Sequence, residues 1–170
     1  YRPVTKFWKT DSGWFVDSPG DPSMTSDQLR SLRKRYGSGS KVFVRQAYRP
    51  GFGPGWEWDD LPNRYAPTVS AFTFDTASFE LWGSPNKLWI KGGPDFGIKI
   101  SRDAKAAGAN RFDLASRQLV VVGPMPKSEG KIEAFALPNP DHLAASLLGG
   151  KFIAATGMPK SEPTVEVPGD

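Results

Sequence analysis

The apolar residues of this chain fall in short runs, and clusters of Gly, Pro, Asn and Ser separate these runs. Runs of about four to eight residues between such turn formers predict β-strands. Residues 6–9 and 14–16 are expected to pair as a hairpin whose turn is Ser12–Gly13. Further strands are expected at residues 41–45, 79–82, 87–90, 98–100, 119–122 and 131–137. The run at 119–122 is continuously apolar, which predicts a strand that is buried on both faces.

Two segments follow the period of an α-helix instead. Residues 26–36 carry apolar side chains three and four positions apart, which gives the helix one apolar face. Thr25 or Ser26 suits the N-cap position, and Gly37 is expected to end the helix. The second helix is expected at residues 140–148, before a Gly–Gly pair. The sequence thus predicts two principal helices in a strand-rich chain.

This combination of elements predicts an α+β fold, mostly β, with short-stranded sheets and two packed sub-domains. The first sub-domain comprises residues 1–70 and 138–158, because the last helix is expected to return to the part that holds the first helix. The second, strand-rich sub-domain comprises residues 71–137. Residues 159–170 are polar and rich in proline, so a flexible tail is expected there.

The composition agrees with a folded, strand-rich chain. The 170 residues suffice for one ordinary domain or two small ones. The 11 Phe and 6 Trp supply much of the core, because each aromatic side chain buries a large apolar area. The 18 Gly and 16 Pro are many for a helix bundle, and they suit short strands that are joined by turns.

Charge and hydropathy exclude several classes of protein. The net charge is +4, and the densest basic cluster, at residues 30–35, is expected to be the solvated face of the first helix. Nucleic-acid binding requires a wider basic stripe, so no nucleic-acid partner is expected. No apolar run reaches the length of about 18 residues that a membrane-spanning helix needs. The chain has no initiator Met and no signal peptide, so we expect an excised fragment or a processed product.

Few residues offer catalytic or metal-binding chemistry. The chain has no Cys, which excludes disulfide and thiolate chemistry. His142 is the single histidine, so a Ser-His-Asp triad or a His-based metal site would have to use it. No serine stands in a nucleophile-elbow pattern, and no second His or Cys can join His142 at a metal ion. We therefore expect no metal and no cofactor.

Three short patterns imitate serine–lysine acyl-transfer chemistry. That chemistry requires a nucleophilic Ser one helical turn before a Lys, a Ser-x-Asn element and a Lys-Thr-Gly strand. Ser31 and Lys34 match the first pattern, but they lie in mid-helix among arginines, where the lysine stays hydrated and charged. Ser84 and Lys87 match the first two patterns, but Ser84 precedes a proline in an expected turn. Lys91–Gly93 lacks the hydroxyl residue of the third, so no catalytic residue is expected.

The longest segment without periodicity runs from Arg49 to Pro67 and is rich in Gly, Pro and aromatic residues. Loops of this length either pack on their own side chains or carry a function. The candidates in this segment for ligand contact, or for a purely structural loop, are Trp56, Trp58, Asp59, Asp60 and Tyr65.

Several segments of the chain carry one further pattern when they are taken in order. The most specific are Gly55–Leu61 and Tyr65–Ala71. They are accompanied by Tyr1–Lys6, Ser18–Thr25 with its Gly-Asp-Pro element, Arg117–Pro126 and Asn139–Pro140. Together they resemble the class C low-molecular-mass penicillin-binding proteins, which are D-Ala-D-Ala carboxypeptidases and endopeptidases of the bacterial cell wall. The chain departs from this family at Phe74–Ala77, where the family often has an acidic residue followed by Asn.

The resemblance implies an extracytoplasmic accessory module that is inserted into the transpeptidase-like catalytic domain of one parent chain. The parent would hydrolyse the D-Ala-D-Ala bond of peptidoglycan through an acyl-enzyme. The nucleophile of the family would precede Tyr1, and its Ser-x-Asn and Lys-Thr-Gly motifs would follow Asp170, so this chain is expected to be inactive alone. The aromatic loop would then contact peptidoglycan or, as the structural alternative, seal the core of the module.

Two other classes of function stay open. A free-standing secreted carbohydrate-binding or cell-wall-binding module would show exposed, coplanar indoles at Trp56, Trp58 and Trp82, whereas buried indoles would count against it. An intact serine hydrolase would use Ser31 or Ser84 and would form a covalent adduct with a fluorescent penicillin.

Overall fold

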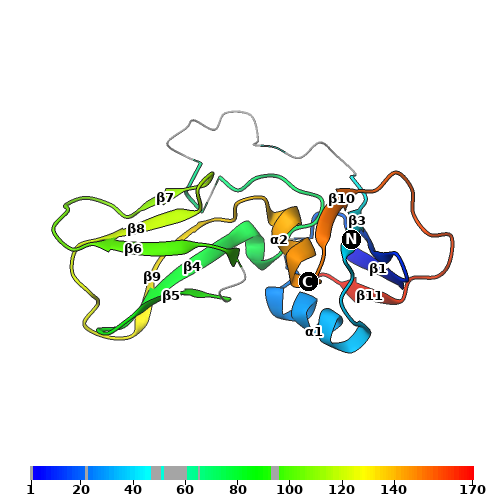
Figure 1. Cartoon of the computed structure of the whole chain (residues 1–170), viewed down its shortest axis with the longest axis horizontal. Helices are drawn as coiled ribbons and strands as arrows, with labels where there is room; N and C mark the ends of the chain where they lie inside the picture. Colours follow the sequence, from blue (N-terminus) through cyan, green and yellow to red (C-terminus); the bar gives the residue numbers. More distant parts are fainter. Residues whose placement is uncertain (1, 22, 47–50, 52–60, 65, 93–95) are drawn as a thin grey trace. The chain divides into compact units, whose positions relative to one another are not determined.

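The computed structural model describes the chain except for residues 1, 22, 47–50, 52–60, 65 and 93–95. Two α-helices, one short 3₁₀ helix (Asp75–Ala77) and three small sheets account for the regular structure of the described residues (Figure 1), which confirms the expected α+β, mostly β class. The chain divides into two compact units. Unit 1 comprises Tyr1–Gly51, Thr68–Ala77 and Asn139–Asp170, and unit 2 comprises Phe52–Pro67 and Ser78–Pro138.

Unit 1 is built on a mixed five-stranded sheet in the order β10-β3-β2-β1-β11. The strands are β1 (Val4–Thr10), β2 (Gly13–Asp17), β3 (Lys41–Val44), β10 (Lys151–Ala154) and β11 (Val165–Pro168). Strand β1 is antiparallel to β2 and β11, whereas β3 is parallel to β2 and β10. Parallel neighbours need a crossover connection, and α1 (Ser26–Tyr36) supplies it between β2 and β3.

Both predicted helices are confirmed. Helix α1 has Thr25 as its N-cap, in a capping box with Gln28, and Gly37 as its C-cap. Helix α2 (Pro140–Leu147) follows Asn139, whose backbone is left-handed and whose side chain makes no capping hydrogen bond. Within unit 1, α2 contacts α1, β3 and β10.

The core of unit 1 lies on one face of the five-stranded sheet. Phe7, Trp14 and Val42 are 0% exposed on this face, whereas Trp8 on the other face of β1 keeps 8% exposure. The Trp14 ring stands edge-on to the rings of Phe7 and Tyr36, with 6.2 Å between ring centroids in each pair. Leu29 supplies the apolar face of α1 and is also 0% exposed.

Three features of unit 1 differ from the sequence-based expectations. The first hairpin turns at Asp11–Ser12, one residue earlier than expected, because Gly13 already pairs with Thr10. Strand β10 was not expected. Residues 165–168, which were expected in a flexible tail, form β11 and pair with β1. Such short edge strands depend on pairing with a neighbour more than on their own residue pattern.

Unit 2 contains two three-stranded sheets, in the orders β5-β4-β9 and β6-β8-β7. The strands are β4 (Ser78–Gly83), β5 (Leu88–Lys91), β6 (Lys99–Asp103), β7 (Arg111–Asp113), β8 (Gln118–Val122) and β9 (Gly130–Ala136). The rings of Phe79, Phe112 and Phe135 pack between the two sheets, with centroids 4.9 to 5.7 Å apart. Strand β8 alternates buried and half-buried residues, so the expectation that it is buried on both faces was wrong.

The segment that leads into unit 2 belongs to unit 1. Phe72 and Phe74 are fully buried, and the ring of Phe72 lies 6.0 Å from the ring of Phe7. Unit 2 therefore resumes at Ser78, whereas the sequence placed the start of the strand-rich part at residue 71.

Candidate functional site

The sequence placed its candidate site in the aromatic loop at 49–67, and the five residues that it named there lie outside the described residues. The residues whose role therefore stays a prediction are Trp56, Trp58, Asp59, Asp60 and Tyr65. Two described residues of this loop pair within their own units. Gly51 bridges Val69 in unit 1, and Asn63 bridges Phe135 in unit 2. A second aromatic cluster is described in full, on one face of the β5-β4-β9 sheet.

Strand register brings two tryptophans together on this face. In the β4–β5 hairpin, Trp82 pairs with Trp89 and Glu80 pairs with Lys91. Directly paired residues of an antiparallel ladder share a face, and Phe79 is buried on the opposite one. The two indole rings have centroids 6.4 Å apart and an interplanar angle of 35°, and both side chains are half-buried.

A β-bulge in β9 adds a lysine to this face. Leu81 pairs with Glu133, but the next residue, Trp82, pairs with Lys131, so the register passes over Ile132. A regular ladder would have placed Ile132 opposite Trp82. Because side chains alternate between faces, one extra residue re-aims those that follow it. The bulge thus gives Trp82 a cationic neighbour in place of an apolar one.

Glu80 joins the charged and aromatic members of the cluster. Its Oε2 accepts a hydrogen bond from Trp82 Nε1 at 2.8 Å and lies 3.5 Å from Lys91 Nζ. Its Oε1 lies 3.0 Å from Lys131 Nζ. The hydrogen bond from Trp82, followed by the one from Lys131, holds the pKa of Glu80 below its ordinary value of 4.5. Partial burial acts in the opposite direction and is outweighed.

Two lysines lie over the indole faces. Lys91 Nζ is 4.8 Å from the ring centroid of Trp82, and Lys87 Nζ is 4.9 Å from that of Trp89. Both distances are those of cation–π contacts. We call the whole cluster the Trp82–Trp89 face, and its members are Glu80, Trp82, Lys87, Trp89, Lys91 and Lys131.

The Trp82–Trp89 face combines two kinds of binding group. Indole rings offer broad apolar faces with a polar edge, and ammonium groups form charge-assisted hydrogen bonds to carboxylates. The sequence left two alternatives for the indoles, an exposed, coplanar platform or a buried core. The half-buried indoles match neither alternative in full. Trp82 was named from the sequence, but Trp89 was not. The expected turn at 83–86 would have paired Trp82 with Lys87, whereas the observed register pairs Trp82 with Trp89.

Replacing Glu80 with Gln is expected to remove part of the pH dependence of stability. The folded-state pKa of Glu80 lies below its unfolded value near 4.5, so the carboxylate stabilises the fold above that pH. This contribution is lost as the pH falls through the folded-state pKa. The stability difference between wild type and Glu80→Gln should therefore be largest at neutral pH and shrink below pH 4.5.

Urea unfolding from about pH 3 to pH 7 measures this difference. Glu129→Gln, which changes an exposed carboxylate in the same unit, is the matched control and should show a smaller pH-dependent difference. A stability difference between wild type and Glu80→Gln that stays constant over this pH range would contradict the lowered pKa of Glu80.

The two serines of the serine–lysine patterns stand in different surroundings. Ser31 is exposed in the middle of α1, as is Lys34 one turn later. Ser84 lies in the β4–β5 turn, where its N–H donates to the Lys87 carbonyl oxygen at 2.9 Å. Neither serine opens a helix, and the ammonium group of Lys87 lies over Trp89.

The single histidine and the carboxylates form no metal site in the described part of the chain. His142 is exposed, and its ring stacks on Phe152 with 4.5 Å between centroids. No group of three His, Cys, Asp or Glu residues among the described positions could hold a metal ion. None of the described helices is long and apolar enough to cross a membrane.

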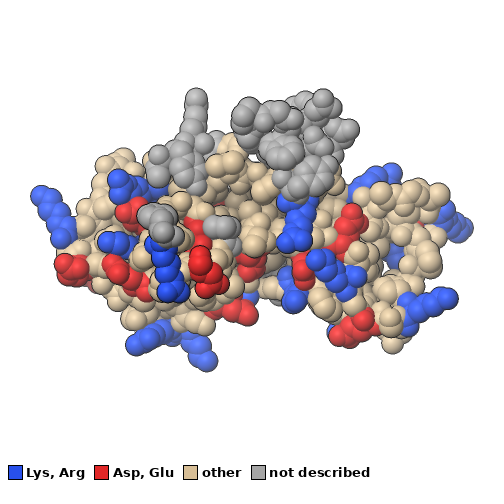
Figure 2. Space-filling view, turned by 180° about the vertical axis from the view of Figure 1, so that it is seen from behind, with Lys and Arg blue, Asp and Glu red and all other residues tan. Residues whose placement is uncertain are grey.

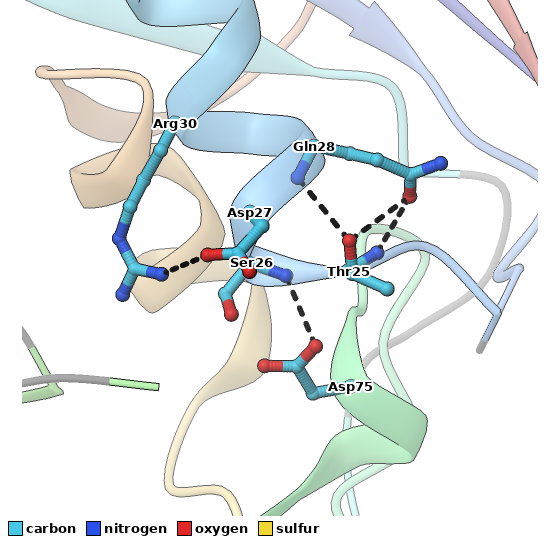
Figure 3. A network of polar contacts seen from close by, with 6 residues as sticks. All are labelled: Thr25, Ser26, Asp27, Gln28, Arg30 and Asp75. Carbon is cyan, nitrogen blue, oxygen red and sulfur yellow. Dashed lines mark hydrogen bonds and ion pairs between the residues drawn. The ribbon is translucent and has the colours of Figure 1, made fainter. Parts of the chain in front are cut away.

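Asp75 lies in the segment where the chain departs from the family pattern, and it caps α1 (Figure 3). Its Oδ1 accepts a hydrogen bond from the Ser26 N–H at 3.0 Å, and its own N–H donates to the Met24 carbonyl oxygen at 2.7 Å. Asp75, Thr76 and Ala77 have φ values of 48°, 56° and 54°, which non-glycine residues rarely adopt. A carboxylate at a helix N-terminus is favoured by the helix dipole. Asp75 thus stabilises the start of α1.

The first and last strands of unit 1 lie side by side, and further hydrogen bonds continue their pairing. The Gly169 N–H donates to the Pro3 carbonyl oxygen at 2.7 Å, and Arg2 Nε donates to the Gly169 carbonyl oxygen at 2.5 Å. The Asp170 N–H donates to Ser23 Oγ at 3.0 Å. Strands β1 and β11 therefore bring the two ends of unit 1 to neighbouring points (Figure 1).

Charged side chains of both signs are intermixed on the face drawn in Figure 2. The chain as a whole carries 22 Lys and Arg against 18 Asp and Glu. Nucleic-acid binding relies on a continuous basic patch or stripe, and the described residues of this face do not form one.

The fold resembles that of penicillin-binding protein 4 (dacB) from Haemophilus influenzae. One crystal structure of that protein matches with a TM-score of 0.68 and 17% identity, over 99% of this chain and 46% of the other. Its complex with a novel β-lactam matches with a TM-score of 0.54 and 17% identity, over 99% and 44%. This chain thus spans less than half the length of these neighbours, and the likeness is one of fold. No family model and no curated protein matches the sequence.

Proposed function

We propose that this chain is a non-catalytic accessory module of a serine-type D-Ala-D-Ala carboxypeptidase that acts on bacterial peptidoglycan outside the cytoplasm. The module is inserted into the transpeptidase-like domain of the same parent chain, and the parent hydrolyses the D-Ala-D-Ala bond through an acyl-enzyme. The observation that carries this proposal is the likeness to a penicillin-binding protein fold over 99% of the chain. The ordered sequence segments described above support the same family.

The pairing of β1 with β11 supports the inserted arrangement. A module can be accommodated within a loop of another domain when its own ends lie close together. Here the first and last strands are antiparallel neighbours, from Val4 opposite Pro168 to Phe7 opposite Val165. The flanking polypeptide could therefore leave and rejoin a host domain at neighbouring points.

The surroundings of the two candidate serines support the non-catalytic part of the proposal. A nucleophilic serine needs an adjacent base whose pKa is lowered by burial or by neighbouring positive charge. Ser31 is exposed on α1, and its lysine partner is exposed as well. Ser84 sits in a hairpin turn, and Lys87 is engaged with an indole ring.

A second candidate function, a free-standing carbohydrate-binding module, is favoured by the half-exposed indole pair Trp82 and Trp89. The sequence that flanks this chain in its parent gene separates the two candidates. An inserted module requires a Ser-x-x-Lys motif upstream and Ser-x-Asn and Lys-Thr-Gly motifs downstream. A parent gene without these motifs would contradict the inserted arrangement and leave the free-standing module.

Incubation of the 170-residue chain with a fluorescent penicillin is expected to give no covalent adduct. The reason is that neither Ser31 nor Ser84 has a buried lysine to accept its proton. Denaturing gel electrophoresis with fluorescence detection, followed by intact mass measurement, checks this result. A complete penicillin-binding carboxypeptidase serves as the positive control. A stoichiometric adduct on either serine would overturn the proposal and identify an intact serine hydrolase.

A further inference from the structure

We infer that the Trp82–Trp89 face binds a carboxylate-bearing glycan, in which a sugar ring packs on the indoles and an acidic substituent meets the lysines. Its residues come from β4, β9 and the β4–β5 hairpin of one sheet. The inference deepens the second candidate function, because it names the class of glycan and the residues that bind it. It needs only unit 2, so it applies equally to an inserted or a free-standing module.

The two indoles form the apolar part of the site. Their 35° tilt and 6.4 Å separation leave the rings neither stacked face to face nor closed edge to face. Both side chains stand on paired strands, and Trp82 is further held by its hydrogen bond to Glu80. Such preorganised side chains lose little conformational entropy when a ligand binds. The apolar face of a sugar ring can therefore pack on them at low cost.

The lysines above and beside the rings form the polar part of the site. The side chains of Lys91 and Lys131 are exposed over 61% and 40% of their area. Cation–π contacts at exposed positions are weak, so a sugar ring can displace an ammonium group from an indole face. The displaced group stays tethered beside the ligand, where it can pair with a carboxylate.

Charge selects the class of ligand. The face carries three ammonium groups, from Lys87, Lys91 and Lys131, against the single carboxylate of Glu80. Glu80 already contacts both Lys91 and Lys131. An acidic ligand adds a second carboxylate to this excess of positive charge, whereas a neutral glycan leaves the excess unmatched. The face therefore favours a glycan with carboxylates over an uncharged one.

The bulge in β9 supports a role in binding for the Trp82–Trp89 face, beyond packing of the sheet. Bulges recur near functional sites because they re-aim side chains. In a regular ladder Ile132 would extend the apolar surface beside Trp82, and the face would be more suited to a purely apolar contact. The observed register places Lys131 there instead, 3.0 Å from Glu80. The change of register thus supplies one of the three cations.

The test uses the 170-residue chain with ¹⁵N-labelled tryptophan indoles, whose N–H signals are followed by NMR. Trp82→Phe and Trp89→Phe assign the two relevant signals. Three probes are titrated separately: a soluble peptidoglycan fragment that joins sugar to an acidic peptide, an uncharged chitin oligosaccharide, and the acidic peptide alone. The fragment is expected to shift the Trp82 and Trp89 signals and to bind at least about fivefold more tightly than either other probe.

Variants separate the aromatic contribution from the charged one. Trp82→Ala and Trp89→Ala are each expected to weaken binding of the fragment at least about fivefold, the scale of one lost aromatic stacking contact. The double variant Lys91→Gln with Lys131→Gln keeps both indoles. It should weaken binding of the fragment more than binding of the uncharged oligosaccharide. Lys105→Gln removes an exposed lysine of unit 2 that lies outside this face, and it should bind like wild type.

Each other outcome overturns the inference. Equal affinity for the charged fragment and the uncharged oligosaccharide would show that the lysines do not select an acidic ligand. Equal shifts with the peptide alone would identify an acidic-peptide surface instead of a glycan site. Absence of indole shifts at millimolar fragment would remove the site altogether. None of these outcomes affects the penicillin-labelling experiment or the flanking motifs, so failure of this inference and failure of the proposed function are distinguishable.

Discussion

Replacing Trp14 with Ala is expected to lower the free energy of unfolding by about 3–5 kcal/mol, a large share of the stability of a single domain. Trp14 is 0% exposed and packs edge-on against Phe7 and Tyr36. Its Nε1 also donates to the carbonyl oxygen of Gly37, the C-cap of α1, at 3.2 Å. Truncation therefore leaves a cavity and an acceptor without its donor at the point where the sheet meets the helix.

Urea unfolding followed by far-UV circular dichroism measures this loss without relying on tryptophan fluorescence. Phe15→Ala on the same strand is the matched control. Phe15 is half-buried on the other face of the sheet, where it stacks on Phe43 with 4.6 Å between centroids. The free energy of unfolding should fall less for Phe15→Ala than for Trp14→Ala, because the Phe15 side chain buries less apolar surface. An equal effect of both variants would contradict the placement of the core on the Trp14 face.

Replacing Gly13 with Ala is expected to destabilise unit 1 by about 3 kcal/mol or more, the sum of a backbone and a steric contribution. Gly13 has a φ of 132°, outside the range that residues with a Cβ normally adopt. A Cβ at this position would also meet the carbonyl oxygen of Lys41 on the neighbouring strand β3. The clash involves backbone atoms, so rotation of a flexible side chain cannot relieve it.

The midpoint of urea unfolding should fall strongly for Gly13→Ala and hardly at all for the control Gly157→Ala. An added Cβ at Gly157 meets nothing within 4 Å. Similar midpoints for wild type and Gly13→Ala would show that β2 and β3 are not held in the register described here. Loss of soluble protein for Gly13→Ala alone agrees with the expected effect.

Local sequence signals predicted those helices and strands that are marked by caps or turn residues next to them in the sequence. The two candidate caps, Thr25 and Ser26, and the stop at Gly37 predicted α1 at residues 26–36, which are its observed bounds. The turn residues at 83–86 located the β4–β5 hairpin. Strand β11 was missed because its four residues are stabilised by pairing with β1, and that partner lies at the opposite end of the sequence. The alternation of Val165, Glu166 and Val167 is present in the sequence, but it is too short to predict a strand by itself.

The candidate site was less predictable than these elements. Loop length sets the register of a hairpin, and the expected turn at 83–86 would have paired Trp82 with Lys87, whereas the shorter observed turn pairs it with Trp89. The contribution of Lys131 was not predictable, since it depends on a bulge that passes over Ile132 and no turn residue marks that position. In the sequence, Glu80 is an ordinary polar residue of an alternating strand. Its role in holding the cluster together follows only from its contacts with Lys91 and Lys131.

The pairing of β1 with β11 also has a consequence for the order of folding. The contact between Arg2 and Gly169 joins residues that are 167 positions apart, and Ser78–Pro138 of unit 2 precedes the last of the three segments of unit 1 along the chain. During synthesis, unit 2 can therefore complete its sheets while β1 still lacks a partner on one side. An unpaired strand edge is a site of aggregation. The yield of soluble protein should then depend on how quickly β11 pairs with β1 once β11 has emerged from the ribosome.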